Sequence, residues 1–213
     1  MNFTERLTWA ITPFKNGLTK NVTKTAELSA DQIRKAAQTE EKVWGNKMIG
    51  SSNNGNWTTQ LGETLVYDIL MLQGKNPRRP ERKGGYAPDW ETDDCIVEVK
   101  TRNWTTTGTA GEKVLGTMYK YSDIPLLYGK PLKIICVAYQ EYELLHGNTR
   151  IFGDDLSNRK QAFLQLAKAF DIEYIKFSDF AINEIEEMKK KIELEKVHVN
   201  NSSDELLPFG CVV

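Results

Sequence analysis

Two carboxylates and a lysine have types and a spacing that could support hydrolytic chemistry. Asp89 comes just before a segment, residues 94–101, that alternates like a β-strand and contains Glu98 and Lys100. Side chains two residues apart in a strand project from the same face. Carboxylates can hold a hard dication that activates water, and a lysine can orient or deprotonate that water or stabilise the charged transition state. The pattern favours metal-assisted hydrolysis of a phosphodiester.

Two further groups could complete such a site. The main-chain carbonyl of Val99, between Glu98 and Lys100, could add an oxygen ligand. Glu63 lies in a segment, residues 60–73, that is predicted to be a helix ended by Gly74. The apolar stripe of this helix follows the 3.6-residue period and consists of Leu61, Leu65, Ile69 and Leu72.

The segment PDWETDDCIVEVK, residues 88–100, resembles the core motif of the PD-(D/E)xK nuclease superfamily, which includes type II restriction endonucleases. In that family the Asp and Glu bind Mg²⁺ and the Lys serves the catalytic water, so the resemblance implies these roles for Asp89, Glu98 and Lys100. Many members carry an acidic residue on the preceding helix, which Glu63 resembles. The resemblance covers mainly residues 60–140.

This resemblance implies a restriction-endonuclease-like fold and an endonuclease that cuts double-stranded DNA with Mg²⁺, or with Mn²⁺ in its place. We expect a sequence-specific type II restriction endonuclease. We also expect a homodimer, because one active site cuts one strand and a two-fold dimer cuts both. One alternative is a repair or recombination nuclease of the same fold that recognises DNA shape or lesions. Another is a DNA-binding protein without catalysis, which the intact set of three residues disfavours.

Simpler interpretations of the same residues remain open. Glu98 and Lys100 could form an ion pair on a solvated strand face, and Asp89 could be a turn residue. Glu63 could be an exposed carboxylate that suits the first turn of a helix. Ile96 shares the strand face with Glu98 and indicates that this face is partly buried, where charges need partners.

Basic and polar residues near the motif could bind DNA. Residues 75–88 are rich in basic side chains that could contact phosphates, and residues 102–113 could reach phosphates or base edges. The candidates are Arg78, Arg79, Arg82, Lys83, Arg102, Asn103, Trp104 and Lys113. The alternative for both segments is a solvated loop. Gln140 follows a buried strand candidate and resembles a polar residue that borders the metal site in some members of the family.

The elements that must position these residues alternate between helix and strand. Such an order predicts an α/β fold with a mixed central sheet flanked by helices. The predicted helices cover residues 26–44, 60–73, 112–121, 158–170 and 181–197. The predicted strands cover residues 94–101, 133–139 and 172–177. We expect one nuclease domain over residues 1–213, with an N-terminal arm at 1–24, a catalytic core at 60–140 and a C-terminal tail at 198–213.

Composition narrows the class of protein. The 213 residues are 40% hydrophobic and 27% charged, which is typical of a globular domain. The formal net charge of −1 means that any DNA binding must depend on a local basic patch. Three cysteines without a CxxC motif and two histidines disfavour a disulfide framework and a zinc site. We expect a cytoplasmic protein without a signal peptide or membrane span.

Overall fold

The computed structural model describes residues 29–49, 57–104, 110–187, 190 and 194. The chain divides into two compact units, Met1–Phe180 and Ala181–Val213. Every described strand lies in the first unit. The expected arm at residues 1–24 and the tail at 198–213 fall outside the described residues.

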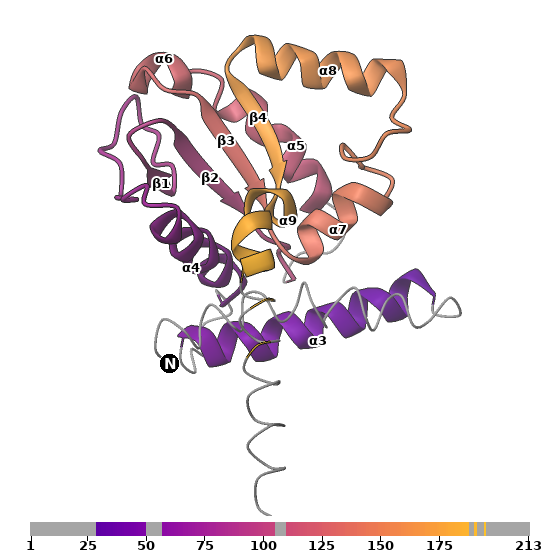
Figure 1. Ribbon diagram of the computed structural model, residues 1–213. Coiled ribbons are helices and arrows are strands. Elements are labelled where there is room, and N and C mark those ends of the chain that lie inside the picture. The colour runs from indigo at the N-terminus through magenta and orange to yellow at the C-terminus, as the bar shows by residue number, and fades with distance from the viewer. Residues whose placement is uncertain (1–28, 50–56, 105–109, 188–189, 191–193, 195–213) are drawn as a thin grey trace, which may run out of the picture. The chain divides into compact units, whose positions relative to one another are not determined.

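A four-stranded mixed sheet with the strand order β1-β2-β3-β4 is the centre of the first unit (Figure 1). β1 (Trp90–Glu91) pairs antiparallel with β2 (Ile96–Lys100). β2 is parallel to β3 (Leu132–Cys136), which is parallel to β4 (Ile172–Lys176). This arrangement confirms the expected α/β class with a mixed sheet. The strand predicted over residues 133–139 is shorter, because a helix begins at Tyr139.

Seven helices with assigned bounds accompany the sheet in the described part of the chain. They are α3 (Ala30–Ile49), α4 (Trp57–Leu72), α5 (Ala110–Lys120), α6 (Ile124–Tyr128), α7 (Tyr139–His146), α8 (Asn158–Ala169) and α9 (Phe177–Phe180). Four of them, α3, α4, α5 and α8, correspond to predicted helices, whereas α6, α7 and α9 were not predicted. Of the helix expected over residues 181–197, the described residues 182–187, 190 and 194 are helical. None of the described helices is both long and apolar enough to cross a bilayer.

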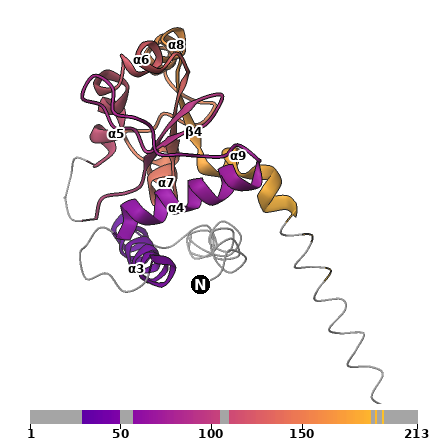
Figure 2. The same ribbon diagram turned by 90° about the vertical axis from the view of Figure 1, so that its left-hand side faces the viewer.

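The core forms where β2 and β3 are covered on both sides. Strand β3 and the residue after it are almost entirely apolar and buried, as expected for a central strand. Helix α4 packs against β2 and α3, and both views show α3 next to α4 (Figures 1 and 2). On α4 the predicted stripe is buried at Leu61, Leu65 and Ile69, whereas Leu72 is exposed. On α8, Ala167 is buried, whereas Phe163 and Leu166 are exposed, as is Phe170 just after the helix.

Residues 75–88, the basic segment, lack regular secondary structure, as their prolines and glycines predict. The segment turns at Gly84 and Gly85, which both have positive φ. Three hydrogen bonds tie it to the region of α6, one from Lys83 Nζ to the carbonyl of Leu127 and two from tyrosine hydroxyls. The Tyr86 hydroxyl donates to Asp123 Oδ2 over 3.2 Å, and the Tyr128 hydroxyl donates to the carbonyl of Glu81 over 2.6 Å.

Candidate active site

The short antiparallel pair of β1 and β2 brings Asp89 beside Glu98. Trp90 pairs with Val97, so extending the register by one residue puts Asp89 opposite Glu98. The main-chain N–H of Val99 donates to Asp89 Oδ2 over 2.7 Å. This bond fixes the Asp89 carboxylate against the strand that carries the other two residues of the motif.

Glu98 and Lys100 share one face of β2, as their spacing predicts. Lys100 Nζ lies 2.5 Å from Glu98 Oε1, and the side chains are 25% and 6% exposed, respectively. The face around Glu98 is therefore buried, which contradicts the simpler interpretation of a solvated ion pair. Glu98 Oε2 is buried without a hydrogen-bond partner among the described residues. A buried anionic oxygen is costly unless something satisfies it, and a cation could do so.

The carboxyl group of Asp89 has a strongly perturbed pKa. Burial, and then the negative charge of Glu98, raise the pKa of Asp89 to about 7. The hydrogen bond from Val99 and the charge of Lys100 oppose this rise, whereas the charge of Glu63 adds to it. Glu98 thus lies close enough to disfavour the ionisation of Asp89, and a bound cation would offset that penalty.

The Val99 carbonyl faces the same side of β2 as Asp89. Ile96 N–H donates to the carbonyl of Pro131, and the Lys100 carbonyl accepts from Val137 N–H, so both residues direct their main-chain groups toward β3. Because these groups alternate along a strand, those of Val99 point the opposite way, as its bond to Asp89 shows. The Val99 carbonyl is therefore in a position to act with Asp89.

Tyr121 borders the site and was missed in the sequence. Lys100 Nζ lies 5.8 Å from the centre of its ring. Burial, followed by the negative charges of Glu98 and Asp89, raises the pKa of the Tyr121 hydroxyl. Tyr121 follows α5 directly, and no motif marks its proximity to the carboxylates.

Glu63 lies next to the site but contacts Arg79. Arg79 Nη2 is 2.5 Å from Glu63 Oε2, and Arg79 Nη1 donates to the Asp89 carbonyl over 2.9 Å. Within the described ranges, no group of three or more His, Cys, Asp or Glu side chains is arranged to hold a metal ion. Glu63 is therefore placed as a neighbour of Asp89 that is paired with Arg79, and it does not join a three-carboxylate cluster.

Several of the candidate DNA-binding residues of the basic segment already contact other residues of the protein. Arg78 pairs with Glu91 at 2.9 Å and with Asp93 at 3.0 Å. Lys83 Nζ lies 4.8 Å from the ring centre of Tyr128. Arg79 is 59% exposed despite its bonds, and Arg82 is exposed as well. The negative charges beside Arg78 weaken its attraction for phosphate, and the pairing of Arg79 with Glu63 has the same effect, which leaves Arg82 as the better candidate.

Two predicted DNA contacts after β2 have partners within the protein. The Arg102 side chain is only 5% exposed, and its Nη1 lies 2.7 Å from both carboxylate oxygens of Glu143. The Trp104 Nε1–H donates to Glu41 Oε2 over 2.5 Å, and its ring packs 5.1 Å from that of Tyr139. Arg102 therefore makes its contact with α7, and Trp104 makes its contacts with α3 and α7. Asn103 and Lys113 are exposed.

Gln140 is fully buried at the start of α7. Its Nε2 donates to Glu143 Oε2 over 3.2 Å, and its Oε1 has no hydrogen-bond partner among the described residues. Gln140 thus belongs to the buried polar group formed by Arg102 and Glu143. Gln140 was expected beside the metal site, but these contacts are with Glu143 and not with Asp89 or Glu98.

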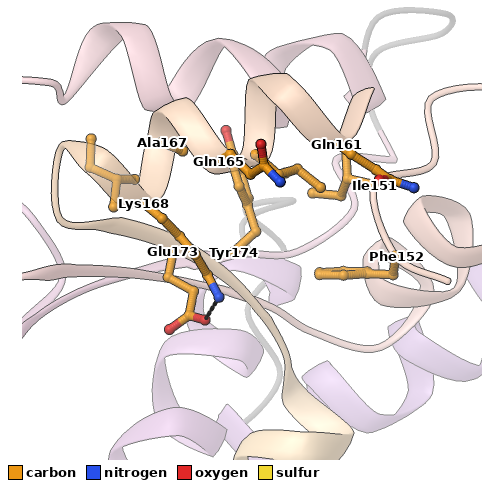
Figure 3. A pocket seen from close by; sticks show the side chains of 10 residues that line it. Ile151, Phe152, Gln161, Gln165, Ala167, Lys168, Glu173 and Tyr174 are labelled. Carbon is orange, nitrogen blue, oxygen red and sulfur yellow. Dashed lines mark ion pairs between the residues drawn. The ribbon is translucent and has the colours of Figure 1, made fainter. Parts of the chain in front are cut away.

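Two cavities differ in their relation to this site. The larger, about 340 Å³, lies between α8, β4 and residues 151–152, and Lys168 and Glu173 form an ion pair at its edge (Figure 3). It contains none of the candidate residues. A second cavity of about 270 Å³ opens beside Glu63 and is called the Trp90 cleft here. It is lined by Gln60, Glu63, Thr64, Tyr67, Arg79 and Trp90.

Comparisons of the chain with protein-family models, curated proteins and solved structures found no match. The functional inference for this protein therefore depends on its own residues and their arrangement.

Proposed function

We propose that this protein is a metal-dependent nuclease that hydrolyses phosphodiester bonds of double-stranded DNA. The observation that carries the proposal is the meeting of Asp89, Glu98 and Lys100 at the β1–β2 pair, with Asp89 bonded to Val99 N–H and Lys100 paired with Glu98. The mixed sheet and the helix with Glu63 agree with the resemblance to the PD-(D/E)xK superfamily.

The donor set fits Mg²⁺. Two carboxylates, Asp89 and Glu98, and the carbonyl of Val99 offer the hard oxygen atoms that this ion prefers. Glu98 Oε2 is buried without a partner among the described residues, so an ion there would remove an existing penalty. Mg²⁺ sites commonly use only one or two carboxylates and complete their shell with water and substrate phosphate, so a third acidic ligand is not required. A bound Mg²⁺ would polarise the phosphate and lower the pKa of water.

In this proposal, Lys100 acts on the attacking water. Its ammonium group is paired with Glu98 Oε1. From this position it can orient a water molecule, or stabilise the negative charge that develops on the phosphate. Asp89 and Glu98 thus bind the metal ion, whereas Lys100 orients the water and stabilises the charge on the phosphate.

We further propose sequence-specific cleavage by a homodimer, as in type II restriction endonucleases. One site of this kind acts on one strand, so two copies related by a two-fold axis would cut both strands of a palindrome. Cleavage guided by DNA shape or lesions is the competing form of the same chemistry. The two forms differ in the products that they yield from plasmid DNA.

The direct test is incubation of the protein with unmethylated plasmid and phage DNA in Mg²⁺ or in EDTA. We expect discrete Mg²⁺-dependent fragments from the wild type and none from Asp89→Ala or Lys100→Ala. The matched control is Asp93→Ala, which removes an exposed carboxylate from the connection between β1 and β2 and should leave cleavage intact.

Different products separate the possibilities. Smears or nicks that disappear in the Asp89 and Lys100 variants would support the nuclease and favour cleavage by shape or lesion. Absence of cleavage on duplex, branched and single-stranded DNA would contradict the nuclease proposal. Binding of DNA without cleavage would favour a non-catalytic DNA-binding protein.

A further inference from the structure

The Trp90 cleft lies directly beside the proposed metal-binding carboxylates. Arg79 in this cleft donates to the main-chain carbonyl of Asp89, and Trp90 is the next residue in the chain. The Trp90 Nε1–H donates to the Glu63 carbonyl over 3.1 Å, which fixes the indole against α4. A group bound in the cleft would therefore neighbour whatever Asp89 holds.

Three flat side chains meet in the cleft. The ring centres of Tyr67 and Trp90 are 5.0 Å apart with their planes tilted by 46°, and Arg79 Cζ lies 4.0 Å from the centre of the Trp90 ring. Arg79 lies over the Trp90 ring and is itself 59% exposed. Its guanidinium is thus an exposed planar group that a flat ligand could cover.

The charges and donors of Arg79 argue against a simple phosphate site. The negative charge of Glu63 lies against its Nη2, and its Nη1 already donates to the Asp89 carbonyl. The paired charges of Arg79 and Glu63 cancel, so the cleft has little net attraction for an anion. What Arg79 still offers a ligand is chiefly its flat face.

We propose that the Trp90 cleft is a nucleobase subsite, which binds one base unstacked from the DNA strand next to the cleaved phosphate. The base lies on the guanidinium plane of Arg79, and its polar edge reaches Gln60 or Thr64. The cavity of about 270 Å³ is near the lower limit for small-molecule sites and suits one base better than a larger ligand. This inference rests on the proposed nuclease function and adds a contact with the substrate strand.

The test measures whether Arg79 recognises a base or a phosphate. Short single-stranded and duplex DNA oligonucleotides carry one abasic site, moved through each position in turn, and their affinity is measured in EDTA so that no cleavage occurs. In the wild type we expect an abasic site at one position to lower affinity at least about fivefold, the lower limit for stacking one base on a flat side chain. Arg79→Lys keeps the charge but loses the plane, so this variant should be insensitive to the same abasic site.

The matched control is Arg159→Lys, which changes an exposed arginine of α8 that lies outside both the cleft and the basic segment. It should retain the abasic sensitivity of the wild type. A second readout uses the wild type alone: an oligonucleotide with 5-iodouracil at the sensitive position should cross-link on irradiation to a residue that lines the cleft, which mass spectrometry can locate.

Three outcomes would overturn the subsite. They are an affinity that no abasic position changes, an Arg79→Lys variant as sensitive as the wild type, and an Arg79→Lys variant weakened equally on every oligonucleotide, which would indicate a phosphate contact. If Mg²⁺-dependent cleavage persists in any of these cases, the nuclease proposal stands and only the subsite fails. A wild type that neither binds DNA in EDTA nor cleaves it in Mg²⁺ would overturn both proposals.

Discussion

Thr101 occupies the space that any side chain at position 62 would need. A Cβ atom on Gly62 would lie 2.3 Å from Thr101 Cγ2 and 3.1 Å from Val99 Cγ1. Helix α4 can therefore pass β2 this closely only because residue 62 has no side chain. Since Glu63 is the next residue, this close approach also determines where Glu63 and its partner Arg79 lie relative to Asp89.

Replacing Gly62 with alanine should separate α4 from β2. We expect Gly62→Ala to lower the free energy of unfolding by about 1–3 kcal/mol, because an added methyl group in a packed interior forces a shift. Urea denaturation measures this change. The control is Gly116→Ala in α5, where an added Cβ would meet no atom within 4 Å. That variant should be neutral or more stable by up to about 1 kcal/mol, because alanine favours helix. Equal destabilisation by both substitutions would contradict the close-approach argument.

Metal binding and cleavage should be separable at Lys100. We expect Lys100→Ala to lower the cleavage rate by about 10²- to 10⁴-fold, the range for a lost acid–base or water-orienting group. Its affinity for Mn²⁺ should stay equal or increase, because Glu98 loses its present partner. Asp89→Ala should lose both cleavage and Mn²⁺ binding. Calorimetric titration with Mn²⁺ beside a plasmid cleavage assay checks the pair, and a loss of ion binding in Lys100→Ala would contradict these roles.

Stability without metal should fall with increasing pH because of Asp89. The pKa of this carboxyl is about 7 in the folded protein, compared with an ordinary value of 3.8. Between these values the folded protein retains a proton that the unfolded chain has released, so the contribution of Asp89 to the free energy of unfolding decreases as pH rises. Asp89→Asn, which does not ionise, should gain stability relative to the wild type from about pH 4 to pH 7. Urea denaturation in EDTA measures the difference, and a difference that does not vary with pH would refute the prediction.

The buried pair of Arg102 and Glu143 should contribute to stability and not to DNA affinity. Glu143→Ala leaves the buried guanidinium without its partner, and we expect a loss of about 3–5 kcal/mol in the free energy of unfolding. The exposed pair of Arg150 and Asp155 is the matched control, and Asp155→Ala should cost at most about 1 kcal/mol. The double substitution Arg102→Met with Glu143→Leu removes both charges and should recover most of the loss. If this double variant folds but binds DNA much more weakly, Arg102 contacts DNA after all.

Local patterns predicted the elements that carry the motif. The alternation in residues 94–101 was enough to place Glu98 and Lys100 on one face, because side chains in a strand must alternate. The apolar period of residues 60–73 likewise predicted the buried side of α4. The order of these local elements along the chain also predicted the α/β class with a mixed sheet.

Contacts between distant segments could not be predicted in the same way. Arg102 follows the strand closely, but the burial of its side chain depends on Glu143 in α7. The sequence did not predict this helix. The apolar run at residues 133–139 is equally consistent with one long strand, so it did not indicate that α7 begins at Tyr139. The approach of Arg79 to Glu63 and of Tyr121 to Lys100 depends on how whole elements pack.

The ties between the basic segment and the region of α6 affect the thermodynamics of any ligand that this segment contacts. Because Tyr86 is bonded to Asp123 and Glu81 to Tyr128, the segment is already ordered before a ligand arrives. Ordering an irregular segment costs about 1–2 kcal/mol of conformational entropy per residue, and here folding meets that cost in advance. Association should then proceed without a slow ordering step of this segment, and calorimetry should show a smaller entropic penalty than in a variant with Tyr86→Phe and Tyr128→Phe.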